Sequence, residues 1–112
     1  MEYQKLPGEN YQVHGQTLIY YMPKELDHHH AEILRTEVEM LLHIHHVKNL
    51  VFDFEQTDFM DSSGIGVLIG RCRNLGYCNG IVYARNLKGR AEKIFRAGGL
   101  GKIIYVISEG EK

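Results

Sequence analysis

Hydrophobic residues at first alternate with polar ones along this chain and then recur at helical spacing. This pattern predicts strands first and then a helix. Near the start, Tyr11 and Val13 alternate with polar residues, and a β-branched and aromatic run occupies residues 17–22. This spacing predicts two short strands, joined as a hairpin by the turn at residues 15–16. Pro23 is expected to end the second strand, because proline has no N–H to donate to a ladder.

Helical spacing begins after Asp27, which is a candidate N-cap. Apolar residues then fall on one face of a helix, at Ala31, Leu34, Val38, Leu41 and Leu42. Residues 47–54 are predicted as a second apolar strand, followed by a polar turn. A further helix is predicted after that turn, with a buried stripe of Ile65, Leu68, Ile69, Cys72 and Leu75.

The last third of the chain repeats the strand and helix pattern. Residues 81–84 are predicted as a core strand, residues 87–97 as a helix that Gly98 and Gly99 end with positive φ, and residues 103–107 as a last strand. The order is ββαβαβαβ, which predicts an α/β fold whose mixed, mostly parallel sheet has crossover helices and an antiparallel start. Residues 1–112 are expected to form a single domain that frays over 1–9 and 108–112.

Composition favours an ordinary globular domain in the cytoplasm. The chain has 112 residues, of which 44% are hydrophobic and 24% charged, and its formal net charge is −1. Such a charge gives no general attraction to nucleic acid or to an anionic membrane. We expect neither a membrane span nor a signal peptide, because no apolar run is long enough. Cys72 and Cys78 have neither metal nor redox spacing, which favours a reducing compartment.

The turn at residues 59–66, with the sequence FMDSSGIG, is the main candidate for chemistry. Asp61, Ser62 and Ser63 are side chains that satisfy the free N–H groups of a helix's first turn. The same position favours an added anion, because the helix dipole is positive there. The residues alone leave two interpretations open, a helix cap and a phosphoacceptor serine.

Two enzymatic interpretations of this turn fail on spacing. A nucleophile elbow needs a glycine two residues before its serine, and neither Ser62 nor Ser63 has one. A dinucleotide-binding loop would need its third glycine one residue before Gly70 and an acidic residue about 20 residues further on. A P-loop is excluded as well, because its Gly-Lys-Ser/Thr ending is absent. We therefore expect no catalytic residue and no cofactor, and we do not expect an enzyme.

Histidines and basic residues gather in three places but predict no further site. His28, His29 and His30 lie roughly 25 Å along the predicted helix from His43, His45 and His46, so the two groups cannot share a metal. Neither group has a carboxylate or cysteine at ligand spacing, and solvated helix ends are expected instead. The basic residues of the second half are expected on solvated helix faces, where they suit an acidic protein surface, and they are Arg71, Arg73, Arg85, Lys88, Arg90, Lys93 and Arg96.

Two segments together resemble the anti-sigma factor antagonists of the STAS domain family. The segments are ELDHHHAE at residues 25–32 and FMDSSGIGVLIGR at residues 59–71. The segment at residues 59–71 is specific to this family. The paired histidines of the segment at residues 25–32 narrow the resemblance to the sporulation type. The predicted ββαβαβαβ order agrees with the fold of that family over nearly the whole chain, although His30 stands where a small polar residue is usual.

The resemblance implies a regulatory switch in transcription rather than an enzyme. Its unphosphorylated form would bind an anti-sigma factor that is also an ATP-dependent serine kinase, and would free the sigma factor. The kinase would phosphorylate Ser62, the serine directly after the motif aspartate, and a serine phosphatase would reset the cycle. Asp27, Asp61, Ser63 and Gly64 are the implied partner-binding residues. The alternative is a STAS adaptor in a stressosome-like signalling assembly, which would not release a sigma factor.

Overall fold

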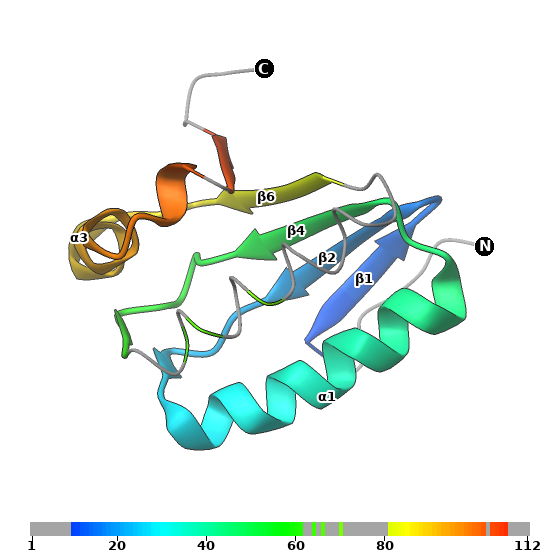
Figure 1. The fold of residues 1–112 in the computed structure, drawn as a ribbon, viewed down its shortest axis with the longest axis horizontal. Helices are drawn as coiled ribbons and strands as arrows, with labels where there is room; N and C mark the ends of the chain where they lie inside the picture. Colours follow the sequence, from blue (N-terminus) through cyan, green and yellow to red (C-terminus); the bar gives the residue numbers. More distant parts are fainter. Residues whose placement is uncertain are drawn as a thin grey trace.

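A computed structural model describes residues 10–61, 64, 66, 70, 81–102 and 104–107. Within these residues the main sheet has five strands in the order β1-β2-β4-β6-β7 (Figure 1). Only β1 and β2 are antiparallel, and every other neighbouring pair is parallel. The strands are β1 (Tyr11–His14), β2 (Thr17–Tyr21), β4 (Asn49–Asp53), β6 (Ile81–Arg85) and β7 (Tyr105–Ile107). The predicted mixed sheet with an antiparallel start is therefore confirmed.

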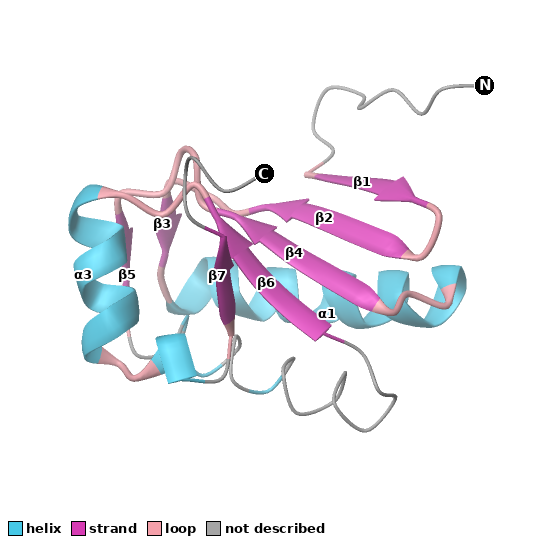
Figure 2. Cartoon of the chain, turned by 90° about the horizontal axis from the view of Figure 1, so that it is seen from above, coloured by secondary structure: helices cyan, strands magenta, loops and turns pink. Residues whose placement is uncertain are grey.

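The helix α1 (His28–His45) covers one face of this sheet, as Figure 2 shows from above. The side chain of Asp27 caps its first turn, and His46 ends it in the left-handed conformation at φ 50°. Four residues of the predicted stripe are buried and Leu42 is half-buried against the core. They pack against strand residues that point to the same face, such as Leu18, Leu50 and Phe52. The predicted N-cap and stripe are confirmed.

A second, smaller sheet was not predicted from the sequence. Its two strands are β3 (Glu25–Leu26) and β5 (Phe59–Met60), which pair in parallel with Leu26 opposite Met60. Two residues are too few to show a period of two, so the hydrophobic pattern could not reveal them. Helix α3 (Gly89–Ala97) packs on β5, and the rings of Phe54 and Phe95 meet edge to face at 5.9 Å. Figure 2 shows β3, β5 and α3 together at one end of the molecule.

The end of the chain differs from its prediction. The last strand begins at Tyr105 rather than at residue 103, because a 3₁₀ helix, η1 (Leu100–Lys102), comes before it. The N–H of Ile104 donates to the carbonyl of Leu100 at 2.9 Å, so residue 104 still belongs to that turn. Of the two glycines after α3, Gly99 has the predicted positive φ of 78°, whereas Gly98 has φ −80°.

The helix predicted after the polar turn lies largely outside the described residues. Its stripe of Ile65, Leu68, Ile69, Cys72 and Leu75 lies outside them, as do Arg71, Arg73 and Cys78. Gly64, Gly66 and Gly70 are described, and all three have helical backbone. The helical conformation at these glycines agrees with the predicted position of the helix.

Candidate functional site

The pairing of β3 with β5 brings the segments around Asp27 and Asp61 to one edge. The N–H of Asp61 donates to the carbonyl of Leu26 at 3.2 Å, which continues the ladder by one residue. Asp27 follows β3 and Asp61 follows β5, so both aspartates stand at the carboxyl ends of adjacent parallel strands. The residues paired at this edge are 34 positions apart in sequence, and the edge is the candidate site.

Gly64 fixes the start of the following helix against β3. A Cβ atom at this buried glycine would lie 2.7 Å from Cγ and 2.8 Å from the carbonyl oxygen of Leu26. Only a residue without a side chain allows that approach. The N–H of Gly64 also donates to Oδ1 of Asp61 at 3.3 Å, so Asp61 acts as a cap for the turn, as its residue type predicts. Ser62 and Ser63 lie outside the described residues, and the structure places Asp61 and Gly64 on either side of them.

Asp27 presents a half-exposed carboxylate at the same edge. Its Oδ1 accepts hydrogen bonds from the backbone N–H of His30 at 3.0 Å and from the ring Nδ1 of His30 at 2.8 Å. The backbone hydrogen bond first, and the ring second, lower the pKa of Asp27, so the side chain is ionised at neutral pH. About two fifths of the side chain faces solvent, with 38% of its surface exposed. A partner can therefore reach a negative charge at this point.

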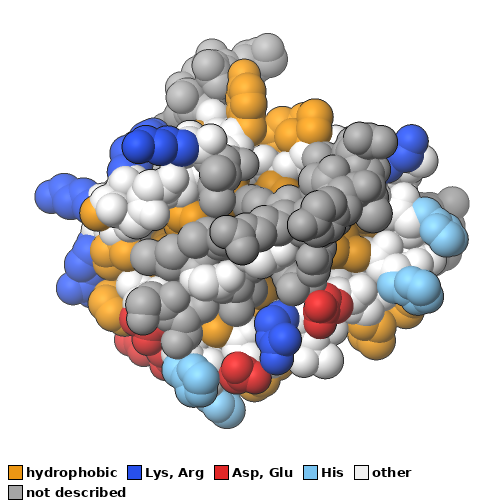
Figure 3. All heavy atoms as spheres, viewed as in Figure 1, with side chains coloured by type: hydrophobic (Ala, Val, Ile, Leu, Met, Phe, Trp, Pro, Cys, Tyr) orange, Lys and Arg blue, Asp and Glu red, His pale blue; other side chains and the backbone are white. Residues whose placement is uncertain are grey.

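Basic and aromatic groups flank the edge on the side of α3. The guanidinium carbon of Arg90 lies 5.7 Å from the centre of the Phe59 ring, and its Nε donates to the carbonyl of Asp58 at 3.4 Å. Lys24 lies 3.9 Å from the carboxylate of Asp58. Lys88, Arg90, Lys93 and Arg96 are exposed, as expected for a solvated face. Figure 3 shows Lys and Arg side chains gathered at the α3 end of the molecule.

The prediction of a solvated helix position was wrong for Arg85. It lies on β6, and its Nε donates to the buried carboxylate of Asp53 at 2.7 Å. The side-chain amide of Asn86 and the N–H of Glu55 also donate to Asp53. Sequence reasoning missed this group, although an aspartate within the apolar run of residues 50–54 was a signal that a paired charge is buried there.

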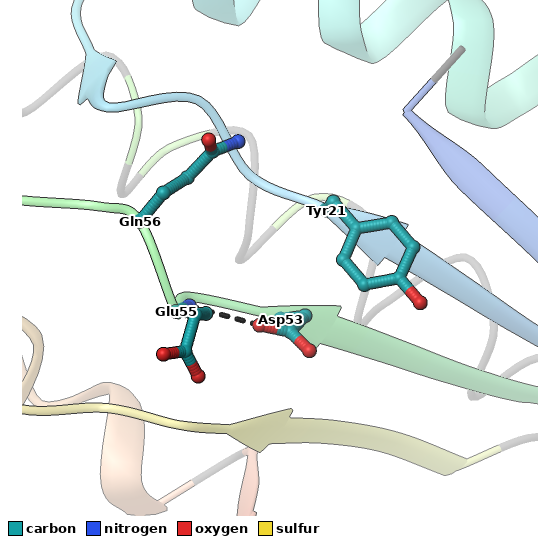
Figure 4. A pocket seen from close by; sticks show the side chains of 4 residues that line it. All are labelled: Tyr21, Asp53, Glu55 and Gln56. Carbon is teal, nitrogen blue, oxygen red and sulfur yellow. Dashed lines mark hydrogen bonds between the residues drawn. The ribbon is translucent and has the colours of Figure 1, made fainter. Parts of the chain in front are cut away.

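A hollow of about 340 Å³ opens at the carboxyl ends of β2 and β4, beside Asp53 (Figure 4). Among the described residues it is lined by Tyr21, Asp53, Glu55 and Gln56. The hydroxyl of Tyr21 donates to Gln12, and the amide of Gln56 donates to the carbonyl of Met22. These polar groups hold the strand ends and the loop together. They do not converge on one point of the hollow, as catalytic groups would have to.

The part of the chain that the structure describes holds neither a metal-binding cluster nor a helix fit to span a membrane. Figure 3 shows histidines in separate groups over the start and the end of α1, and no cluster of three His, Cys, Asp or Glu in the described part of the chain is arranged to hold a metal ion. No helix within the same residues is long and apolar enough to cross a membrane.

The fold and this edge define a known class of domain. The model of the STAS domain matches residues 10–111, so the chain belongs to the STAS domain family. Over 86 residues it is 33% identical to the anti-sigma F factor antagonist of Lysinibacillus sphaericus, a match that covers 77% of this chain and 74% of that protein. The predicted family and fold are thereby confirmed.

Two solved structures agree with that relationship. The Bacillus cell fate determinant SpoIIAA in its phosphorylated form is 31% identical, with a TM-score of 0.68, and the match covers 89% of this chain and 93% of that one. The anti-sigma factor antagonist SpoIIAA in its unphosphorylated form is 28% identical, with a TM-score of 0.69, and the match covers 88% of each chain. Relatives named SpoIIAA are thus known in an unphosphorylated and in a phosphorylated form.

Proposed function

We propose that this chain is an anti-sigma factor antagonist, and that phosphorylation of Ser62 switches off its binding. The observation that carries the proposal is the pairing of β3 with β5, which sets Asp27 beside the turn that begins at Asp61. The names of the similar proteins support the partner class, since they are anti-sigma factor antagonists. The phosphorylated form of SpoIIAA supports a phosphorylation switch.

The proposed partner site consists of Asp27, Asp61, Ser63 and Gly64, around Ser62, with Gly64 as its buried member. Asp27 supplies an exposed negative charge, and Asp61 holds the first turn of the helix through the N–H of Gly64. Gly64 packs closely against Leu26, so the backbone of the turn is held in place against β3. A site held in this way changes little in shape when it binds, which lowers the entropy cost of binding.

The switch follows from the charge that a phosphate adds. Phosphoserine carries about −1.5 to −2 charges at pH 7, and a helix start tolerates them through its dipole and free N–H groups. The fold of the antagonist is therefore preserved. The partner, in contrast, would have to bury a new charge next to the carboxylate of Asp27 without a compensating group, which is unfavourable.

The cycle has three protein components besides this chain. The anti-sigma factor is also the ATP-dependent serine kinase, the sigma factor is the protein that it releases, and a serine phosphatase removes the phosphate. We place this cycle in the cytoplasm, where ATP and the transcription machinery are found, and in a cell-fate programme such as sporulation, which the name of one relative supports. The chain itself acts by binding and performs no catalytic step.

The direct test is a kinase reaction with phosphosite mapping. The chain is mixed with its cognate anti-sigma factor and ATP, and the phosphorylated residue is located by mass spectrometry. We expect phosphate on Ser62 in the natural chain and in a Ser63→Ala control, and none in Ser62→Ala. Phosphate on Ser63 alone, or none in any variant, contradicts the proposal, and binding without sigma release indicates an adaptor instead.

A further inference from the structure

His30 lies at the third position of α1 and turns its ring back toward the N-cap. Its backbone N–H and its ring Nδ1 both contact the same oxygen, Oδ1 of Asp27, at 3.0 Å and 2.8 Å. An N-cap aspartate commonly receives the backbone bond alone. The second bond from the ring fixes the rotation of the carboxylate as well as its position.

The proton of this second bond must come from the histidine. A carboxylate that is ionised can only accept, and the hydrogen bonds from His30 lower the pKa of Asp27, so it is ionised at neutral pH. Nδ1 therefore carries a proton, either in the neutral Nδ1–H tautomer or in the imidazolium. The two forms differ by a full positive charge beside Asp27, and histidines exchange between them in the range of about pH 5 to 8.

Among the described residues, groups of α1 and β2 surround this pair. On α1, the ring of His29 meets that of His30 edge to face with 5.6 Å between centres, and His28 precedes it. On β2, Tyr20 and Tyr21 face His30 across a small hollow of about 70 Å³. Burial first, and then the hydrogen bond that Tyr20 donates to Glu37, raise the pKa of Tyr20, so its hydroxyl stays neutral over the range in which histidine titrates.

Two acidic groups on neighbouring elements have hydrogen-bond partners of their own. Glu37 accepts the hydroxyl of Tyr20, and Asp61, at the end of the neighbouring strand, accepts the N–H of Gly64. Both side chains of the pair are open to solvent, with 45% of His30 and 38% of Asp27 exposed. A protein that binds at this edge therefore meets the two residues together.

We propose that His30 is a positioning residue for Asp27: it holds the carboxylate in one orientation for the anti-sigma factor, and protonation of its ring weakens that binding. The inference rests on the proposed function, in which Asp27 contacts the partner. A donor or a cation of the partner gains most from Asp27 when the carboxylate is the only charge there. An imidazolium at 2.8 Å neutralises that charge and competes with the partner for it.

The first experiment uses the free chain. The carboxyl carbon of Asp27 and the ring nitrogens of His30 are followed by NMR between pH 3 and 9 in the natural chain, His30→Asn and His29→Asn. We expect a protonated Nδ1, and an Asp27 signal with a second inflection in the range of histidine titration. That inflection should be lost in His30→Asn and kept in His29→Asn, which is the matched control. The same inflection in His30→Asn overturns the proposal.

The second experiment measures binding of the cognate anti-sigma factor at pH 8 and pH 6. Exposed charge pairs contribute up to about 1 kcal/mol. Lowering the pH from 8 to 6 should therefore weaken binding of the natural chain about two- to fivefold more than it weakens binding of His30→Asn. His29→Asn should follow the natural chain. An equal pH profile for His30→Asn overturns the proposal that protonation of His30 weakens binding. No binding at either pH contradicts the proposed function and leaves the NMR result to decide whether His30 orients Asp27.

Discussion

Gly64 rests directly on Leu26, so close that a Cβ atom on Gly64 would lie 2.7 Å from the Leu26 side chain. This contact joins the two sequence segments that resemble the family motifs. Leu26 precedes Asp27, and Gly64 follows Ser62 and Ser63, so the contact determines how the carboxylate and the phosphoacceptor turn are placed relative to each other. The short pairing of β3 with β5 therefore matters for function because it sets the position of Asp27 relative to this turn.

Gly64→Ala is expected to destabilise the chain. The added methyl group would meet both the side chain and the carbonyl oxygen of Leu26 at less than 3.0 Å, and the backbone can move only by disturbing β3. Overpacking of this kind costs about 1–3 kcal/mol, measured as the free energy of unfolding in urea. Gly66→Ala is the matched control, because Gly66 is also helical and has nothing within 4 Å of its Cβ position. Equal losses in the two variants would contradict the role given to the Leu26 contact.

Asp53→Ala is expected to destabilise the carboxyl ends of β4 and β6. Arg85 and Asn86 would lose the acceptor that they share, and Asp53 as a whole residue is only 2% exposed. Because Arg85 can still reach water, we expect a loss of about 1–3 kcal/mol in the free energy of unfolding. Glu55→Ala removes an exposed pair with Lys88 at 3.3 Å and serves as the control, for which a loss of at most about 1 kcal/mol is expected. A larger loss for Glu55→Ala than for Asp53→Ala would show that this account of the strand ends is wrong.

The cap at Asp27 gives the stability of α1 a dependence on pH. Its pKa is lower in the folded chain than in the unfolded one, so the stabilisation is present above the unfolded pKa and is lost as the pH falls through the folded pKa. The difference in melting temperature between the natural chain and Asp27→Ala should therefore be larger above about pH 5 than in acid. It should shrink progressively below about pH 4, where aspartate becomes protonated. Thermal unfolding followed by circular dichroism checks this, and a difference that grows toward acid pH would contradict it.

The main sheet and α1 could be predicted because their patterns are long. The run of residues 17–22 is rich in β-branched and aromatic residues, and the stripe from Ala31 to Leu42 repeats the helical period several times. Tertiary packing agrees with local preference in both. β3 and β5 were missed because two residues carry no period. The last strand was placed two residues early because the apolar character of residue 104 serves the 3₁₀ turn after Leu100 rather than a ladder.

The site could be predicted only in part from the residues themselves. The type of Asp61 predicted a cap, and the structure shows its bond to Gly64. No spacing rule could show that Asp27 stands beside this turn, because that proximity comes from the parallel pairing of segments far apart in sequence. The resemblance to the family indicated both segments, whereas the bond from the His30 ring could be found only from the geometry of the side chains.

The central claim is that an uncharged turn binds the anti-sigma factor and a negatively charged one does not. It is tested most directly by measuring the affinity of Ser62→Ala and Ser62→Asp for the cognate anti-sigma factor, together with release of the sigma factor. Ser62→Ala should bind as the unphosphorylated chain does and release the sigma factor. Ser62→Asp should bind at least about tenfold more weakly, equivalent to about 1.4 kcal/mol, because the partner would bury an unpaired charge. Equal affinities of the two variants would contradict a switch based on charge at Ser62.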